Sequence, residues 1–127
     1  MDTPNFLKEH VALFQGFSAE RLQRLVAESR RVSFEANEAI AHRGEEAAHL
    51  GVVLSGSLTA SVLGNGGTRQ ALGELKAGDT FNEMALMTGD PVMADFIAGS
   101  RCEALLVPVS VFQSAIVTEP GVVQNRR

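Results

Sequence analysis

The chain has 127 residues, of which 45% are apolar, enough for one domain with a buried core. Eleven basic residues against fifteen acidic ones give a net charge of −4, which argues against nucleic-acid binding because phosphates require a basic face. The single cysteine, Cys102, excludes a disulfide within the chain and fits a reducing compartment. There is neither an apolar run of about 20 residues nor an apolar N-terminal segment, so we expect a cytoplasmic domain that does not enter the membrane.

The beginning of the chain, residues 1–31, predicts two amphipathic helices. Apolar residues recur at helical spacing over residues 6–14 and stop at Gly16. A second run starts after Ser18, which can act as an N-cap, and places Leu22 and Leu25 on one face.

Residues 32–107 have the shorter period of β-strands. Apolar and β-branched runs predict strands at 32–34, 39–42, 50–54, 57–63, 69–75, 93–98 and 103–107. The Gly-Asn-Gly-Gly segment at 64–67 predicts a hairpin, because these residues tolerate positive φ. The pattern indicates a mainly β fold, an antiparallel jelly roll or barrel of about eight strands, with helices at both ends.

A short helix is expected inside this strand region. Residues 82–87 are mostly good helix formers, begin with Asn82 as a candidate cap, and end before Gly89-Asp90-Pro91. A helix inserted between strands indicates a functional site.

The end of the chain, residues 110–127, predicts two further helices. The first spans 110–117, and Thr118 and Pro120 have the cap and first-turn chemistry of a second one. The second pattern stops at Arg127 after hardly two turns. We therefore expect a truncated last helix and a longer protein, with an output domain after residue 127.

The order of these elements and several short motifs resemble the cyclic nucleotide-binding domain. This is the sensor module of catabolite activator-type regulators, cyclic-nucleotide-dependent kinases and gated channels. The resemblance runs from about Phe6 to Val117. It rests on Leu13-Phe14-Gln15-Gly16-Phe17-Ser18, on residues 40–44, on Val53-Leu54-Ser55-Gly56-Ser57-Leu58 and on Leu75-Lys76-Ala77-Gly78-Asp79-Thr80-Phe81.

The segment Phe81-Asn82-Glu83-Met84-Ala85-Leu86 is similar to the family's phosphate-binding cassette, F-G-E-x-A-L, and we assign the cassette to residues 81–96. The resemblance implies that backbone N–H groups of the short helix and an arginine hold the cyclic phosphate, and that a glutamate, here Glu83, accepts from the ribose 2′-hydroxyl. The ligand-binding positions that it implies are Phe81, Asn82, Glu83, Met84, Ala85, Leu86, Val92, Met93, Ala94 and Asp95.

This chain departs from the family pattern at three of these positions. Val92 stands where the arginine is expected, Asp95 replaces a small hydroxyl residue, and Asn82 replaces the cassette glycine. Residues 77–100 contain four acids and no Lys or Arg. The sequence therefore predicts little or no binding of cAMP or cGMP.

Several side chains keep two interpretations at this stage. Glu83 contacts a ribose or is a solvated carboxylate at a helix start, and Asp95 is an edge carboxylate or selects a cationic or hydroxyl-bearing ligand. The methionines pack in the core or line a pliable pocket; they are Met84, Met87 and Met93. Arg69 and Arg101 are expected to be surface charges, although their loops could bring them to the pocket.

No catalytic or metal-binding motif is present. The histidines His10, His42 and His49 lack metal-ligand spacing, and no nucleophile pattern or phosphate loop occurs. We predict a non-enzymatic regulatory domain with no resident cofactor. Two alternatives remain open: a functional cyclic-nucleotide-binding domain of a transcription regulator, enzyme or transporter, or a ligand-free module that forms a homodimer through its C-terminal helix.

Overall fold

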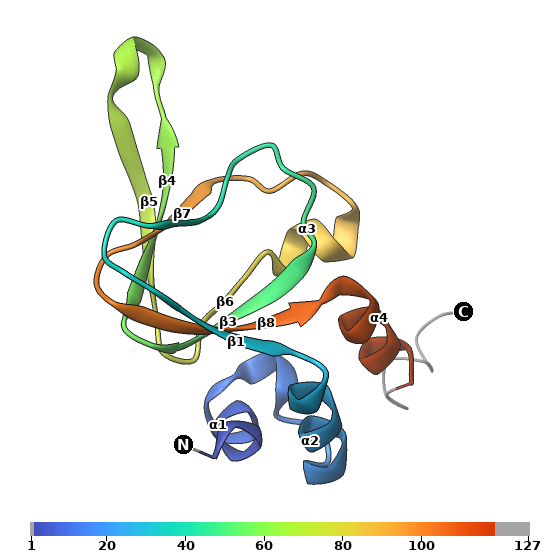
Figure 1. The fold of residues 1–127 in the computed structure, drawn as a ribbon. Helices are drawn as coiled ribbons and strands as arrows, with labels where there is room; N and C mark the ends of the chain where they lie inside the picture. Colours follow the sequence, from blue (N-terminus) through green and yellow to red (C-terminus); the bar gives the residue numbers. More distant parts are fainter. Residues whose placement is uncertain (1, 119–127) are drawn as a thin grey trace.

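The computed structural model of this chain describes residues 2–118 and consists of two facing antiparallel sheets with helices at one end (Figure 1). The strand order is β1-β8-β3-β6 in the first sheet and β2-β7-β4-β5 in the second. The expected mainly β, antiparallel architecture of eight strands is confirmed. Of the two architectures expected, the structure has the jelly roll, and no ladder among the described strands joins the edges of the two sheets into a closed barrel.

The strands are β1 (Arg30–Phe34), β2 (Ala39–Ala41), β3 (His49–Ser55), β4 (Ser57–Leu63), β5 (Arg69–Lys76), β6 (Thr80–Phe81), β7 (Asp95–Ala98) and β8 (Cys102–Pro108). All seven predicted strands are present. The sequence missed β6, which is only two residues long and pairs with the middle of β3. Strand β7 begins at Asp95, two residues later than expected.

The helices are α1 (Thr3–His10), η1 (Ala12–Phe14), α2 (Ala19–Ala27), α3 (Glu83–Thr88) and α4 (Val109–Thr118). The first expected helix is interrupted at Val11, whose backbone is extended. The Ser18 cap is confirmed, since its hydroxyl accepts the Arg21 N–H at 3.2 Å. Helix α4 ends at Thr118, and the expected last helix lies outside the described residues.

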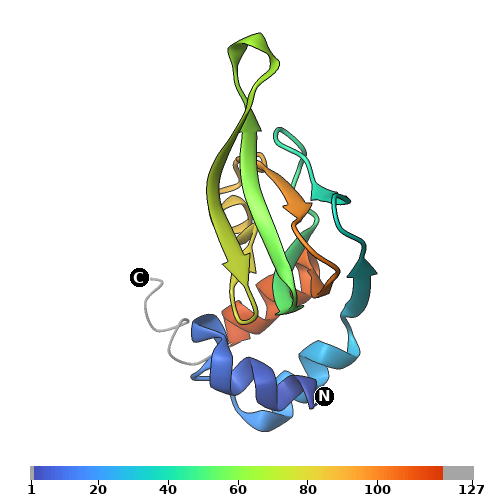
Figure 2. The same ribbon diagram turned by 90° about the vertical axis from the view of Figure 1, so that its left-hand side faces the viewer.

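The first sheet separates two hydrophobic cores. On one face, its strands pack against the helices at the end of the molecule opposite the β4–β5 hairpin tip (Figure 2). This helical core includes Phe14, Leu22 and Leu50, each fully buried. On the other face, the strands meet the second sheet in an inter-sheet core that includes Val53 and Leu58. The cassette therefore connects the two sheets, since it begins at Phe81 of β6 in the first sheet and ends at β7 of the second.

The predicted hairpin connects β4 and β5. Its tip is a single 3-10 turn, Asn65–Gly67, in which Gly66 and Gly67 have φ of 84° and 83°. These positive values are the reason the turn needs glycine. The hairpin projects well beyond the sheets (Figure 2), and β5 is the exposed edge of the second sheet.

Candidate functional site

A cavity of about 450 Å³ opens where the connection between β2 and β3 passes the start of α3. Its lining residues come from four separate parts of the chain and are Ile40, Ala41, Glu45, Glu46, Ala47, Ala48, His49, Phe81, Asn82, Val92 and Leu106. We call this space the β2–β3 cavity. Its volume falls within the range typical of small-molecule sites.

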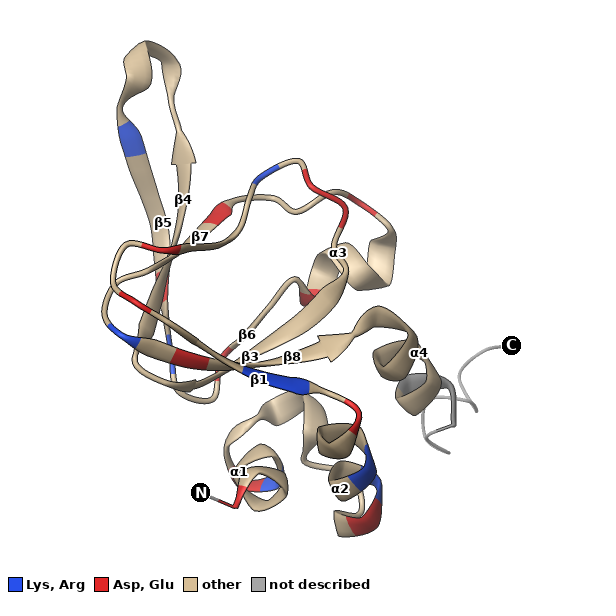
Figure 3. Cartoon of the chain, viewed as in Figure 1, with Lys and Arg blue, Asp and Glu red and all other residues tan. Residues whose placement is uncertain are grey.

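The β2–β3 cavity is apolar at its base and acidic at its rim. None of its described lining residues is Lys or Arg, whereas Glu45 and Glu46 both line it. In Figure 3 the connection between β2 and β3 contains an acidic stretch of backbone, coloured red. Burial and the charge of Arg30 both lower the pKa of His49 below its usual 6.5, so this imidazole is neutral at pH 7. The lining of the cavity is therefore negatively charged, whereas an anionic ligand requires a positively charged one.

Val92 occupies the position at which the resemblance places an arginine. It is 3% exposed, and its isopropyl group belongs to the inter-sheet core. Its N–H donates to the Glu45 carbonyl at 2.8 Å, and its own carbonyl accepts the Gly44 N–H at 2.8 Å. These two bonds hold Val92 against the β2–β3 connection, so the cavity wall at this point is hydrocarbon.

Asn82 has the left-handed backbone that a cassette glycine would supply, with φ 68° and ψ 6°. The expectation that its side chain caps α3 is wrong, because the Asn82 Nδ2 donates instead to the His49 carbonyl at 3.3 Å. Among the described residues, its Oδ1 is buried without a hydrogen-bond partner. A buried acceptor without a donor is costly.

Glu83 lies outside the β2–β3 cavity. Its Oε1 accepts the Thr80 hydroxyl at 2.7 Å, and it lines a neighbouring hollow of about 180 Å³. That hollow is lined by Thr80, Phe81, Asn82, Glu83, Met84, Ala85, Met93 and Phe96. As the first residue of α3, Glu83 is also favourably placed in the field of the helix dipole.

The three cassette methionines are exposed. Met84, Met87 and Met93 have exposed fractions of 62%, 52% and 68%, so the interpretation as core residues is wrong. Met84 and Met87 lie on the short α3 and Met93 lies in the segment before β7, and none of the three belongs to either core. Leu86 packs against the helical core, and Ala94 is buried in the inter-sheet core.

Asp95 is paired with a cation that the cassette itself lacks. Its Oδ2 accepts from Arg69 Nη1 at 2.8 Å, and its Oδ1 accepts the Arg43 N–H at 2.8 Å. These bonds lower the pKa of Asp95 below its usual 3.8. Asp95 does not line the β2–β3 cavity. Arg69 also donates to the Ser61 hydroxyl at 2.9 Å, and Arg101 pairs with the exposed Glu35, so both arginines are surface ion-pair residues.

The structure thus brings only three predicted site residues, Phe81, Asn82 and Val92, to the β2–β3 cavity. Sequence reasoning missed the other lining residues, which come from β2, the β2–β3 connection, β3 and β8. The similarity of residues 40–44 to a family landmark was the one signal near them.

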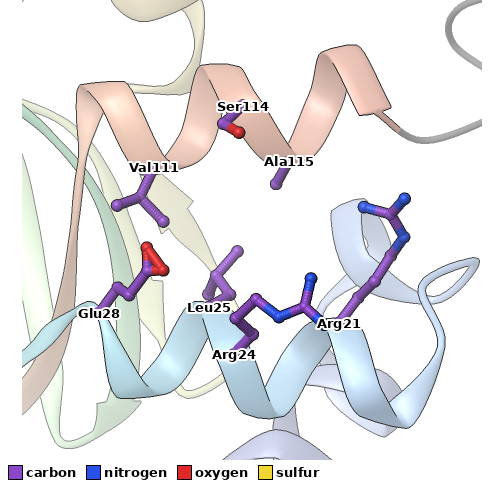
Figure 4. A pocket seen from close by; sticks show the side chains of 7 residues that line it. All are labelled: Arg21, Arg24, Leu25, Glu28, Val111, Ser114 and Ala115. Atoms are coloured by element: carbon purple, nitrogen blue, oxygen red, sulfur yellow. The ribbon is translucent and has the colours of Figure 1, made fainter.

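A smaller hollow of about 90 Å³ lies between α2 and α4 (Figure 4). Leu25 of α2 faces Val111 and Ala115 of α4, with Arg24 and Glu28 on either side. This space is too small for a nucleotide-sized ligand. It marks the contact between the N-terminal helices and the last described helix.

Other site chemistries find little support in the described part of the chain. Residues 2–118 contain no group of three His, Cys, Asp or Glu side chains that could hold a metal ion. No described helix is long and apolar enough to cross a membrane. Cys102 is fully buried, and burial together with Glu103 raises the pKa of its thiol, which makes it a poor nucleophile.

The family model described as cyclic nucleotide-binding domain matches residues 31–119, more than half of the chain. A search of the curated proteins finds no match. For three similar solved structures, the sequence identity, the TM-score and the share of each chain that is covered are as follows. The regulatory domain of Toxoplasma gondii PKA with cAMP is 24% identical with a TM-score of 0.82, over 98% of this chain and 48% of that one. The sensor domain of the transcriptional regulator DNR from Pseudomonas aeruginosa is 20% identical with a TM-score of 0.85, over 94% and 80%.

The regulatory subunit of a cAMP-independent protein kinase A from Trypanosoma brucei is 20% identical with a TM-score of 0.83, over 97% of this chain and 45% of that one. This chain therefore spans about half the length of the two kinase subunits. At these identities, the structural likeness concerns the fold. The matched family model covers most of the chain and shows that the chain belongs to the cyclic nucleotide-binding domain family.

Proposed function

We propose that residues 1–127 form a single non-catalytic sensor domain whose ligand site is the β2–β3 cavity, and that this site binds cAMP and cGMP weakly or not at all. The observation that carries the proposal is the composition of the wall. Val92 contributes hydrocarbon where a phosphate requires a cation, and the described lining residues hold two carboxylates and no Lys or Arg.

The energetic argument depends on the missing arginine. A hydrogen-bonded contact between a guanidinium and a phosphate contributes roughly 1.5–3 kcal/mol, which is one to two decades of affinity. Arg69 and Arg101 do not compensate for its loss, because Arg69 is held by Asp95 and Arg101 by Glu35 on the outside of the sheets. The carboxylates at the rim act in the same unfavourable direction.

The relatives support a regulatory role of this kind. By their names, the Pseudomonas aeruginosa protein is the sensor domain of a transcriptional regulator and the Toxoplasma gondii protein is a regulatory domain of PKA with cAMP. The Trypanosoma brucei protein is the regulatory subunit of a cAMP-independent protein kinase A. The same fold thus occurs with cAMP and in a regulator that does not depend on it. We propose that this chain is likewise coupled to an output domain, and that Phe81, Asn82 and Val92 contact its ligand.

Isothermal titration of the chain with cAMP and with cGMP tests the proposal. No heat of binding is expected up to about 100 µM nucleotide, which corresponds to a binding free energy weaker than about −5.5 kcal/mol. A dissociation constant in the low micromolar range would contradict it.

A pair of variants tests whether position 92 is the cause. Val92→Arg combined with Asp95→Thr should produce or strengthen cAMP binding, whereas Val92→Leu combined with Asp95→Thr, the uncharged control, should not. If the arginine variant keeps its far-UV circular dichroism and melting temperature but does not bind cAMP, the charge of position 92 is not what prevents binding.

A further inference from the structure

We propose that the β2–β3 cavity selects an apolar amine: a ligand with a hydrophobic body and an ammonium group that donates hydrogen bonds. This inference rests on the proposed function, which makes the cavity the ligand site. It adds the chemical class of the ligand, which is cationic, in contrast to the anionic cyclic nucleotides.

The shape and walls of the cavity favour a compact hydrophobic body. Phe81 and Val92 are almost completely buried and form the base, and Ile40 and Leu106 are half-buried beside them. Burial of an apolar group against these side chains contributes roughly 25 cal/mol per Å² of contact. The volume of about 450 Å³ leaves room for a single ring system with a short side chain.

The charges around this body favour a cation. Of the ionisable lining residues, Glu45 and Glu46 are anionic, and His49 is neutral for the reasons given above. Glu45 is partly engaged, since its Oε1 accepts the His42 N–H at 2.8 Å and its Oε2 lies 3.5 Å from the His42 Nδ1. Arg30, whose charge acts on His49, and Arg43 in the β2–β3 connection do not line the cavity. Glu46 is therefore the carboxylate best placed to pair with an ammonium.

Asn82 supplies an independent argument about hydrogen bonding. Because its Nδ2 must be the donor to the His49 carbonyl, the orientation of the amide is determined and Oδ1 is the end without a partner. A buried acceptor of this kind requires a donor. Oδ1 is closed off from solvent as the side chain stands, so a ligand reaches it only when the Asn82 amide turns toward the cavity; an ammonium can then donate to it, whereas a carboxylate or phosphate brings only further acceptors.

Three indole compounds that differ in one group test the inference: tryptamine with an ammonium, tryptophol with a hydroxyl and indole-3-acetate with a carboxylate. Each is titrated into the ¹⁵N-labelled full chain at low salt, and the NMR signals of the Asn82 side-chain amide and of the His49 and Phe81 backbone are followed. We expect tryptamine to bind most tightly, tryptophol less tightly, and indole-3-acetate at least about tenfold more weakly than tryptamine.

Matched variants assign the selectivity to named groups. Glu46→Gln should weaken the binding of tryptamine about three- to fivefold and leave the binding of tryptophol unchanged, because only the ammonium group is attracted by the carboxylate. Glu74→Gln, which removes an exposed carboxylate on β5 away from the cavity, should change neither. Asn82→Gly, which retains the left-handed backbone but removes Oδ1, should weaken both compounds.

The inference is overturned if indole-3-acetate binds as tightly as tryptamine, if Glu46→Gln leaves tryptamine binding unchanged, or if no compound shifts these signals at about 5 mM. These outcomes are separate from those of the proposed function. A chain that binds cAMP at low micromolar concentration contradicts the proposed function, whereas a chain that binds neither cAMP nor the indoles contradicts only the choice of ligand.

Discussion

Asn82 combines a strained backbone with a side chain shared between β3 and the β2–β3 cavity. Its positive φ would cost a residue such as alanine about 1–2 kcal/mol, and asparagine tolerates this conformation better because its short polar side chain can bond locally. Its bond to the His49 carbonyl supplies such a contact. One residue thus determines the direction in which the chain enters α3 and the polarity of the cavity wall.

We expect Asn82→Ala to be less stable than Asn82→Gly by about 1 kcal/mol. Both variants lose the bond to His49, but only alanine retains the left-handed strain. Urea unfolding monitored by circular dichroism measures the difference. Asn37, with φ 75°, provides a second pair of variants in which the same order is expected; equal stabilities at position 82 would show that the backbone there relaxes.

The pair of Arg69 and Asp95 makes stability depend on pH. Because its pKa is lower in the folded than in the unfolded chain, Asp95 stabilises the fold above its unfolded pKa, and this contribution is lost as the pH falls through the folded value. Arg69→Met should lower the free energy of unfolding by less than about 1 kcal/mol at pH 7. The difference in this free energy between the variant and the unsubstituted chain should shrink below pH 3.8.

Urea unfolding at a series of pH values between 7 and 3 tests this expectation. Arg101→Met is the control, because Arg101 and Glu35 are both about two-thirds exposed and solvent screens their pair. A gap between Arg69→Met and the unsubstituted chain that does not change with pH would mean that Arg69 acts through packing and not through Asp95.

At the scale of elements, β6 is anchored to β3 by the contact of an aromatic ring with a residue that has no side chain. A Cβ placed on Gly51 would lie 2.0 to 2.4 Å from the ring atoms of Phe81. The ring therefore occupies the space above Gly51 while its other side lines the β2–β3 cavity. This contact also explains why a strand of two residues is stable at this position.

We expect Gly51→Ala to destabilise the chain by about 1–3 kcal/mol, because the ring must leave its position. Phe81→Leu combined with Gly51→Ala should recover part of this loss, so that the two substitutions are not additive. Chemical denaturation of the four chains of this double-mutant cycle gives the coupling energy. Gly73→Ala, where a Cβ has open space, is the control and should cost far less; additive effects at 51 and 81 would contradict the proposed contact.

At the scale of the whole molecule, the first sheet belongs to both cores. Leu50 and Val52 face the helices, while Val53 and Ala104 face the second sheet. Disruption of either core therefore removes one of the two layers that support the same strands. We infer that the helices and the sheets unfold together.

Leu22→Ala in the helical core and Leu58→Ala in the inter-sheet core should each cost about 2–5 kcal/mol and lower one common transition. Both leucines are fully buried. Because the chain has no Trp or Tyr, unfolding is best followed by circular dichroism at 222 nm and by methyl NMR signals from each core. Separate midpoints for the methyl signals of the two cores would show that the helical layer unfolds independently.

Much of this architecture could be predicted from local patterns. The Ser18 cap, the positive-φ turn at Gly66 and Gly67, the α3 segment and seven of the eight strands all depend on residues close together in the sequence. Their preferences are set by neighbouring backbone and side-chain chemistry. The replacement of the cassette arginine by Val92 was likewise visible without a structure.

The sequence by itself determined the elements, the mainly β fold class and the absence of Lys and Arg from residues 77–100, because each of these follows from residue types at short separations. Only the tertiary structure decided that Asp95 is neutralised by Arg69, that Met84 and Met93 are exposed, and that Glu46 and His49 share a cavity with Val92. The packing of the sheets brings Glu46 and Val92 together although they are 46 positions apart in the sequence. Strand β7, which begins with Asp95, lies between β2 and β4 in the second sheet. Hydropathy records which side of a strand is buried but not which strand lies next to it, so contacts of this kind emerge only when the sheets pack.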